Sequence, residues 1–198
     1  MHCLCIIILV MKMKISVGIS NRHIHLNEED YKCLFGNIPL TKRNDLKQPK
    51  MYACNETLII KGSKGSIANV RVLGPLRNYT QVEVSRTDAY TLGVNPPIRN
   101  SGDIQGAYPI TIIGPVGTIT RDACIIATRH IHVDKNIRKE HNLEGIDKVS
   151  VKIDSKKGGI IQNVYLKDSD EAYFELHLDT DDANAFFLNQ DDEVEILR

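Results

Sequence analysis

The tetrapeptide Arg-His-Ile-His occurs twice in this sequence, although the whole chain of 198 residues contains only seven histidines. On a β-strand, residues i and i+2 point to the same face. If both copies are extended, His23 and His25 can reach one metal ion, and His130 and His132 can reach another. Imidazole nitrogens suit zinc and its first-row neighbours. The repetition therefore predicts a metal-binding role for both copies.

An internal repeat indicates a third ligand for each histidine pair. The segment ISNRHIHL aligns with IATRHIHV, and farther along the chain VEVSRTDA aligns with LHLDTDDA at an offset of 94 residues. This offset places Glu83 opposite His177, and both side chains are good metal ligands. The alternative is that the two are unrelated strand residues that face solvent. The predicted ligand sets are His23, His25 and Glu83, and His130, His132 and His177.

Three protein ligands leave coordination positions open, which is typical of catalytic rather than structural zinc. An anion could be held nearby by Arg77, which lies in the segment LGPLRNYTQVE after a Gly-Pro turn. A guanidinium matches the geometry of phosphate and carboxylate oxygens. Judged from this segment alone, a solvated loop arginine is the alternative. Arg22 and Arg129 precede the histidine pairs, and their strand positions favour a structural or supporting role over catalysis.

Short segments rich in β-branched residues and bounded by turn residues recur along the chain. Their length and alternation are typical of strands in an all-β barrel or sandwich. Two short helices are expected, one that begins after Asn27 and one from Thr180 to Leu188. Because the internal repeat fills nearly the whole chain, the predicted fold class is all-β, with two small β-barrels and a few short helices.

Composition restricts the class of protein. Lys and Arg together number 25, as do Asp and Glu, so the formal net charge is zero. This balance argues against nucleic acid or an anionic membrane as the main partner. Five cysteines without a C-x-x-C pair indicate a reducing, cytosolic compartment. The apolar run from Cys3 to Met11 is too short for a membrane span of about 20 residues, and residues 1–13 are predicted to be an extension outside the fold.

The motifs resemble those of the PduL-type phosphate propanoyltransferases, which are phosphotransacylases associated with bacterial microcompartments. The resemblance rests on SNRHIHL, NVRVLGPLR, TQVEVSRTDA, TRHIHV and ELHLDTDDANA, which follow one another in the family's order from about Val17 to the C-terminus. It implies an acyltransferase of propanediol degradation that moves a short acyl group between coenzyme A and inorganic phosphate. Both propanoyl and acetyl groups stay open as the acyl group.

The resemblance also implies an interleaved fold and a set of site residues. The first barrel would comprise residues 14–21 and 128–198, and the second residues 22–127, with the metal site between them. Two zinc ions would occupy the two ligand sets, and Arg77 would be the catalytic residue that binds phosphate. The implied contacts of coenzyme A are Ser20, Arg71, Leu73, His177 and Asn184.

The resemblance further implies acyl-coenzyme A and phosphate as substrates, a homo-oligomer, and association with a microcompartment. The segment CIIILV lacks the polar face of an amphipathic targeting helix, so a cytoplasmic location stays open beside a microcompartment. Neither nucleic acid nor a membrane is expected as a partner. The alternative function is a dinuclear zinc hydrolase that acts on a thioester or an amide; a non-catalytic, metal-stabilised scaffold is a further alternative.

Overall fold

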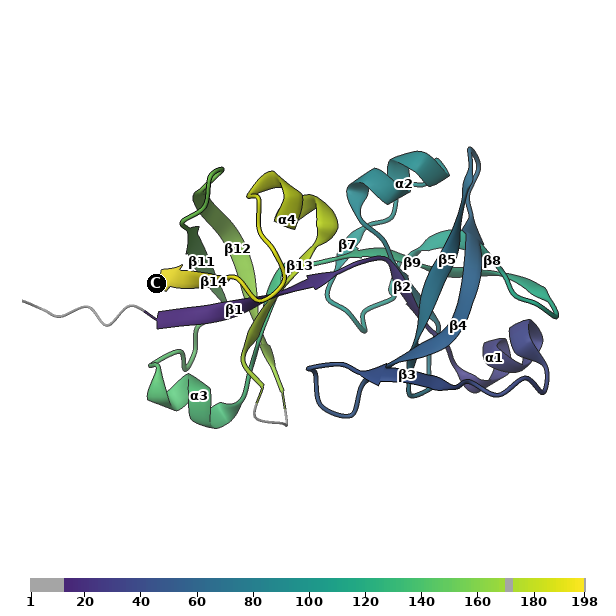
Figure 1. The fold of residues 1–198 in the computed structure, drawn as a ribbon, viewed down its shortest axis with the longest axis horizontal. Coiled ribbons are helices and arrows are strands. Elements are labelled where there is room, and N and C mark those ends of the chain that lie inside the picture. Colours follow the sequence, from purple (N-terminus) through teal and green to yellow (C-terminus); the bar gives the residue numbers. More distant parts are fainter. Residues whose placement is uncertain (1–12, 170–172, 198) are drawn as a thin grey trace, which may run out of the picture.

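Two β-barrels lie side by side in the computed structural model, which describes residues 13–169 and 173–197 (Figure 1). Over these residues, each barrel closes through six strands, and the chain adds four short helices. The predicted fold class, two small barrels with few helices, is confirmed. Most of the predicted N-terminal extension lies outside the described residues, but Met13 begins the first strand, one residue earlier than expected.

The first barrel combines the first strand with the C-terminal part of the chain. Its strands are adjacent in the order β1-β13-β10-β12-β11-β14. Side chains at alternate positions, such as Val17, Ile131 and Leu176, are fully buried in its core. The strands are β1 (Met13–Ser20), β10 (His130–Val133), β11 (Lys148–Ile153), β12 (Gly159–Asp168), β13 (Glu175–Asp179) and β14 (Glu193–Leu197).

The second barrel closes in the order β4-β5-β2-β6-β9-β8, with β8 paired back to β4. Two shorter strands extend this sheet, β3 beside β4 and β7 beside β9. The strands are β2 (His23–His25), β3 (Lys42–Asp45), β4 (Tyr52–Lys61), β5 (Ser66–Gly74), β6 (Gln81–Glu83), β7 (Ile98–Arg99), β8 (Tyr108–Ile113) and β9 (Thr118–Ala127).

The four helices of the described chain are α1 (Glu28–Phe35), α2 (Arg86–Leu92), α3 (Lys135–Glu140) and α4 (Thr180–Ala185). Each follows an N-cap side chain that accepts a hydrogen bond from the third helical N–H group, which stabilises a helix start. Helices α1 and α4 were predicted, although α4 ends before the predicted Leu188. Helices α2 and α3 were not predicted, even though Ser85 and Asp88 form a capping box at the start of α2.

The chain crosses between the barrels at two equivalent places. Strand β1 belongs to the first barrel and β2 to the second, whereas β9 belongs to the second and β10 to the first (Figure 1). Both crossings end at the first histidine of an Arg-His-Ile-His copy. The two histidine pairs therefore begin where the barrels meet. That residues 14–21 with 128–198 form one domain and residues 22–127 another stays a prediction.

Candidate metal centre and active site

His23, His25 and Glu83 come together on neighbouring strands of the second barrel. The antiparallel register of β2 and β6 places His23 directly opposite Glu83. One ligand atom from each of the three side chains lies within 4.8 Å of the others, and His23 Nε2 is 3.6 Å from Glu83 Oε2. None of the three residues is more than 9% exposed. The structure thus assembles the first predicted ligand set.

His130, His132 and His177 form an equivalent group in the first barrel. The antiparallel register of β10 and β13 places His130 opposite His177, just as His23 lies opposite Glu83. The Nε2 atoms of His130 and His132 are 3.2 Å apart, and the ligand atoms of all three residues lie within 4.8 Å of one another. The offset of the internal repeat therefore corresponds to equivalent positions in the two barrels.

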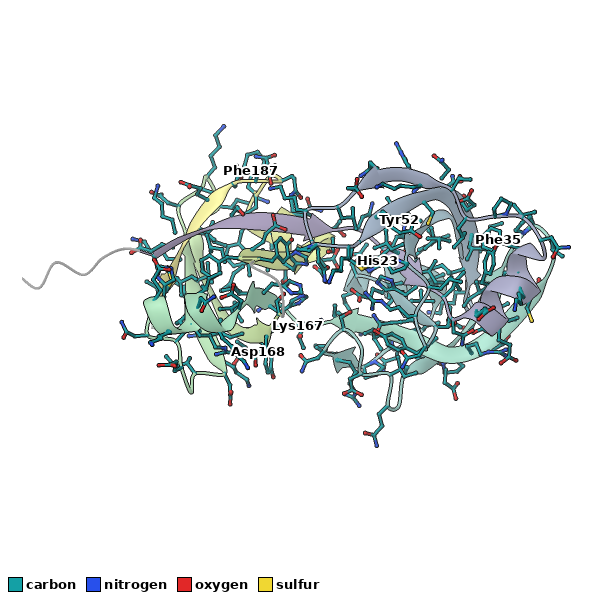
Figure 2. All side chains as sticks on the ribbon, turned by 90° about the horizontal axis from the view of Figure 1, so that it is seen from below. His23, Phe35, Tyr52, Lys167, Asp168 and Phe187 are labelled. Carbon is teal, nitrogen blue, oxygen red and sulfur yellow. The ribbon has the colours of Figure 1, made fainter. Side chains whose placement is uncertain are left out.

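A cavity of about 470 Å³ is lined by residues of both barrels. All six predicted ligand residues line it. Figure 2 shows His23 and Lys167 near the junction of the two barrels. The two ligand sets consequently face one common space, because each crossing between the barrels leads directly into a histidine pair.

The rings of His23 and His130 are oriented in a way that suits metal binding. His23 Nδ1 lies 2.8 Å from the carbonyl oxygen of Asn21, and His130 Nδ1 lies 2.8 Å from that of Thr128. A ring that donates its Nδ1–H group to a carbonyl keeps the lone pair of Nε2 free for a metal. His25 Nδ1 is buried and has no hydrogen-bond partner among the described residues, which is costly unless a ligand occupies it.

The protonation of the ligand residues also fits a metal. Burial, together with the neighbouring histidines, lowers the pKa of His130 to about 4 and the pKa of His132 to about 2. Burial disfavours charge on both His23 and Glu83, but their mutual attraction prevails, so the pKa of Glu83 is well below its usual value and the pKa of His23 is raised. Neutral His130 and His132 and ionised Glu83 are therefore ready to bind zinc or its neighbours, whereas His23 has to release its proton when a metal binds.

Arg77 lines the cavity on the side of the second barrel. Its backbone N–H donates to the carbonyl of Leu26 at 2.8 Å. Its Nη1 donates to the hydroxyl of Tyr79 at 2.7 Å, and its guanidinium carbon lies 5.6 Å from the centre of the Tyr79 ring. No carboxylate among the described residues forms an ion pair with Arg77. The guanidinium is thus held by the neutral side chain of Tyr79, and its charge remains available to an anion.

Of the residues expected to contact coenzyme A, Ser20, Arg71, Leu73 and His177 line the cavity. Arg71 Nη1 donates to the carbonyl groups of two residues in β4, at 3.0 and 2.7 Å. Asn184 is exposed on α4 and is not among the residues that line the cavity. Its contact with coenzyme A stays a prediction.

Arg22 and Arg129 form equivalent ion pairs outside the ligand sets. Arg22 Nη1 donates to Asp88 at 2.8 Å, and Arg129 donates two hydrogen bonds to Asp182, at 2.7 and 2.6 Å. Asp88 and Asp182 are related by the same offset of 94 residues and occupy the first turns of α2 and α4. Each arginine therefore ties the segment before a histidine pair to a helix, in agreement with the predicted structural role.

Several side chains at the cavity were not predicted from the sequence. Glu175 accepts hydrogen bonds from Tyr173 and from Lys47, and its Oε2 lies 3.0 Å from His177 Nε2. Glu175 precedes His177 by two residues on one strand, so alternation could have indicated it. Lys47 follows β3 in the second barrel. Nothing in the sequence around it indicates a site residue, because only the packing of the barrels brings it to Glu175.

The lack of a side chain at Gly18 explains how the carboxylate of Glu175 fits beside His177. Strand β1 runs parallel to β13, and Gly18 lies opposite His177 in the register. A Cβ atom at Gly18 would lie 2.4 Å from Glu175 Oε2 and 3.2 Å from His177 Cδ2. The absence of a side chain at this position therefore makes room for the contact between Glu175 and His177.

Replacing Gln81 with leucine is expected to lower the metal affinity of the first ligand set by roughly 10- to 100-fold, the usual effect of losing a hydrogen bond to a metal ligand. Gln81 Nε2 donates to Glu83 Oε1 at 2.6 Å, and its Oε1 accepts from the N–H of Gly102 at 2.8 Å. Competition with a chromophoric zinc chelator measures the effect. The exposed Gln105→Leu variant is the control, and unchanged affinity in Gln81→Leu would contradict the prediction.

Comparison with known proteins gives the class of the chain. A family model described as phosphate propanoyltransferase matches residues 16–189. The phosphate propanoyltransferase of Thermotoga maritima is 47% identical over 181 residues, which cover 90% of this chain and 86% of the relative. That of Rhodopseudomonas palustris is 42% identical over 181 residues, with coverage of 90% and 80%. That of Citrobacter freundii is 45% identical over 172 residues, with coverage of 84% and 80%.

Together, these matches identify the protein as an enzyme of the acyltransferase class. More particularly, the chain belongs to the phosphate propanoyltransferase family. Among the described residues, no helix is long and apolar enough to cross a membrane.

Proposed function

We propose that this acyltransferase moves a propanoyl group between coenzyme A and inorganic phosphate, and that its six ligand residues hold two zinc ions. The observation that carries the proposal is the convergence of two three-ligand groups and Arg77 on one cavity. The name shared by the relatives supports propanoyl as the acyl group. Acetyl-coenzyme A is the competing donor.

The proposed reaction is a direct displacement at the thioester. Arg77 holds phosphate with its guanidinium donors, and a phosphate oxygen attacks the carbonyl carbon. As the new C–O bond forms, the C–S bond breaks and coenzyme A leaves as a thiolate. Zinc, when bound, supplies Lewis-acid stabilisation of the negative charge that develops. The reverse reaction uses the same groups.

The cysteines of the described chain argue against a thioester-linked acyl-enzyme. Cys54 and Cys124 are buried in the core of the second barrel and Cys33 is exposed on α1; none of the three lines the cavity. Burial raises the pKa of Cys54 to about 11, so its thiolate is scarce at neutral pH. Ser20 lines the cavity and keeps an ester-linked acyl-enzyme as the alternative.

The proposed substrates are acyl-coenzyme A and phosphate, with Ser20, Arg71, Leu73 and His177 as contacts of coenzyme A at the cavity wall. The outermost contact, Asn184, would lie beyond the cavity. A homo-oligomer and a location in the cytoplasm or inside a bacterial microcompartment complete the proposal, on the basis of the family resemblance.

An assay of coenzyme A release tests the function directly. Metal-quantified protein is supplied with propanoyl- or acetyl-coenzyme A, with and without inorganic phosphate. Release of the free thiol is expected only with phosphate, together with an acyl phosphate that hydroxylamine traps as a hydroxamate. Chelation is expected to stop the reaction and added zinc to restore it. Release of coenzyme A without phosphate would instead favour the dinuclear zinc hydrolase.

A further inference from the structure

Lys167 is a cation in the cavity wall that has no role in the reaction proposed above. It lies on β12, and the parallel register of β10 and β12 places it beside His132. Its side chain lines the same cavity as the two ligand sets and Arg77. Figure 2 shows Lys167 on the side of the first barrel that faces the second.

Among the described residues, Lys167 has no carboxylate within ion-pair distance. Its Nζ donates to the backbone carbonyl of Ser101, in the second barrel, at 3.2 Å. In the part of the chain that the structure describes, no carboxylate forms an ion pair with it. A partly buried cation is costly when no anion compensates it. Burial accordingly lowers the pKa of Lys167; Glu83 opposes this shift and Arg77 adds to it.

Two charged residues of the second barrel interact with Lys167 electrostatically. One is Arg77, which also lacks a carboxylate partner among the described residues, and the other is Glu83, which is engaged by His23 and Gln81. Two cations that converge on one space repel each other unless an anion lies between them. Both side chains line the same cavity, so an anion bound between them would relieve this repulsion.

We propose that Lys167 is a second phosphate-binding residue of this enzyme, which holds the anion from the first barrel while Arg77 holds it from the second. The inference rests on the proposed function and extends it. Ser101 Oγ also accepts a hydrogen bond from Gln81 Nε2 at 3.1 Å, so the residue that Lys167 contacts is connected to the ligand set of Glu83. The phosphate site is complete only when both barrels contribute their cation.

A purely structural role for Lys167 is the rival explanation, because its hydrogen bond to Ser101 joins the barrels. Two substitutions separate the explanations. Lys167→Gln retains a donor for the Ser101 carbonyl and removes the charge, whereas Lys167→Arg retains the charge. Lys152→Met is the matched control, because Lys152 is exposed on β11 of the same barrel.

The test compares the KM for phosphate with the KM for propanoyl-coenzyme A. For Lys167→Gln, the KM for phosphate is expected to rise roughly 10- to 100-fold, as for the loss of one hydrogen bond between charged groups. The KM for the acyl donor is expected to change less than about twofold. Lys167→Arg is expected to restore most of the phosphate affinity. Calorimetric titration with inorganic phosphate measures the same loss without turnover, and zinc content is measured for every variant.

An unchanged phosphate affinity in Lys167→Gln overturns the inference, and so does a loss of zinc or of melting temperature with no change in the KM for phosphate. Failure of the proposed function has a different signature. The wild-type protein would then release coenzyme A without phosphate, and no variant of Lys167 would be needed to show it. If the wild type requires phosphate but Lys167→Gln leaves the KM for phosphate unchanged, only the role of Lys167 is rejected.

Discussion

Replacing His132 with alanine is expected to remove zinc from the second ligand set and to reduce acyl transfer by roughly a thousandfold, as for the loss of a principal group that stabilises the transition-state charge. His132 is 4% exposed, and its ring centre lies 4.9 Å from that of His130 and 4.8 Å from that of His177. Two imidazoles remain in the variant, which is too few to hold the ion tightly.

Elemental analysis and the coenzyme A release assay check this prediction together. The zinc content is expected to fall from two ions to one per chain, because the first ligand set belongs to the other barrel. His141→Ala is the control, since His141 lies at the end of α3 and stacks on Phe174, outside the cavity lining. A His132→Ala protein that retains two zinc ions and full activity would show that this residue is not a ligand.

Replacing Arg77 with alanine is expected to lower kcat/KM for phosphate by roughly 100- to 1000-fold and to leave the zinc content unchanged. The guanidinium donates to the Tyr79 hydroxyl and has no acidic partner among the described residues. Its loss therefore removes charge from the cavity without leaving a carboxylate unpaired. Arg77→Lys is expected to recover only part of the activity, because an ammonium group cannot form the two-pronged contact of arginine.

Steady-state kinetics at varied phosphate measures the effect of Arg77. The control is Arg86→Ala, which removes an exposed arginine that donates to Asn95 and lies outside the cavity lining. Unchanged phosphate dependence in Arg77→Ala would remove this residue from the mechanism. A parallel loss of zinc would instead assign it a structural role.

The two groups of candidate ligands could be predicted because they follow from alternation along a strand and from the internal repeat. Alternation along a strand places His23 beside His25 and His130 beside His132. The third ligand followed from duplication, since two copies of one barrel have the same strand register, and Glu83 and His177 occupy equivalent places in it. The starts of the helices after Asn27 and Asp179 could be predicted from equally local signals, since an N-cap acts within a single turn.

Helices α2 and α3 were not predicted, although the sequence contains local signals for both. Ser85 and Asp88 form a capping box that indicates the start of α2, and Asp134 is the N-cap of α3. Gln81 and Glu175 lie on the same strand faces as Glu83 and His177, so the rule that found the ligands also indicates the side chains that contact them.

By itself, the sequence determined the candidate ligand residues, the strand face that each one occupies and the duplication of the barrel, because periodicity and repeat spacing act within a strand or between copies. Only the tertiary structure decided what faces these residues across the cavity. Strand β1 pairs within the first barrel and β9 within the second, so both ligand sets face one cavity, which Arg77 and Lys167 also line. Such contacts join segments about ninety residues apart, and they depend on strand pairing and barrel packing that no local pattern encodes.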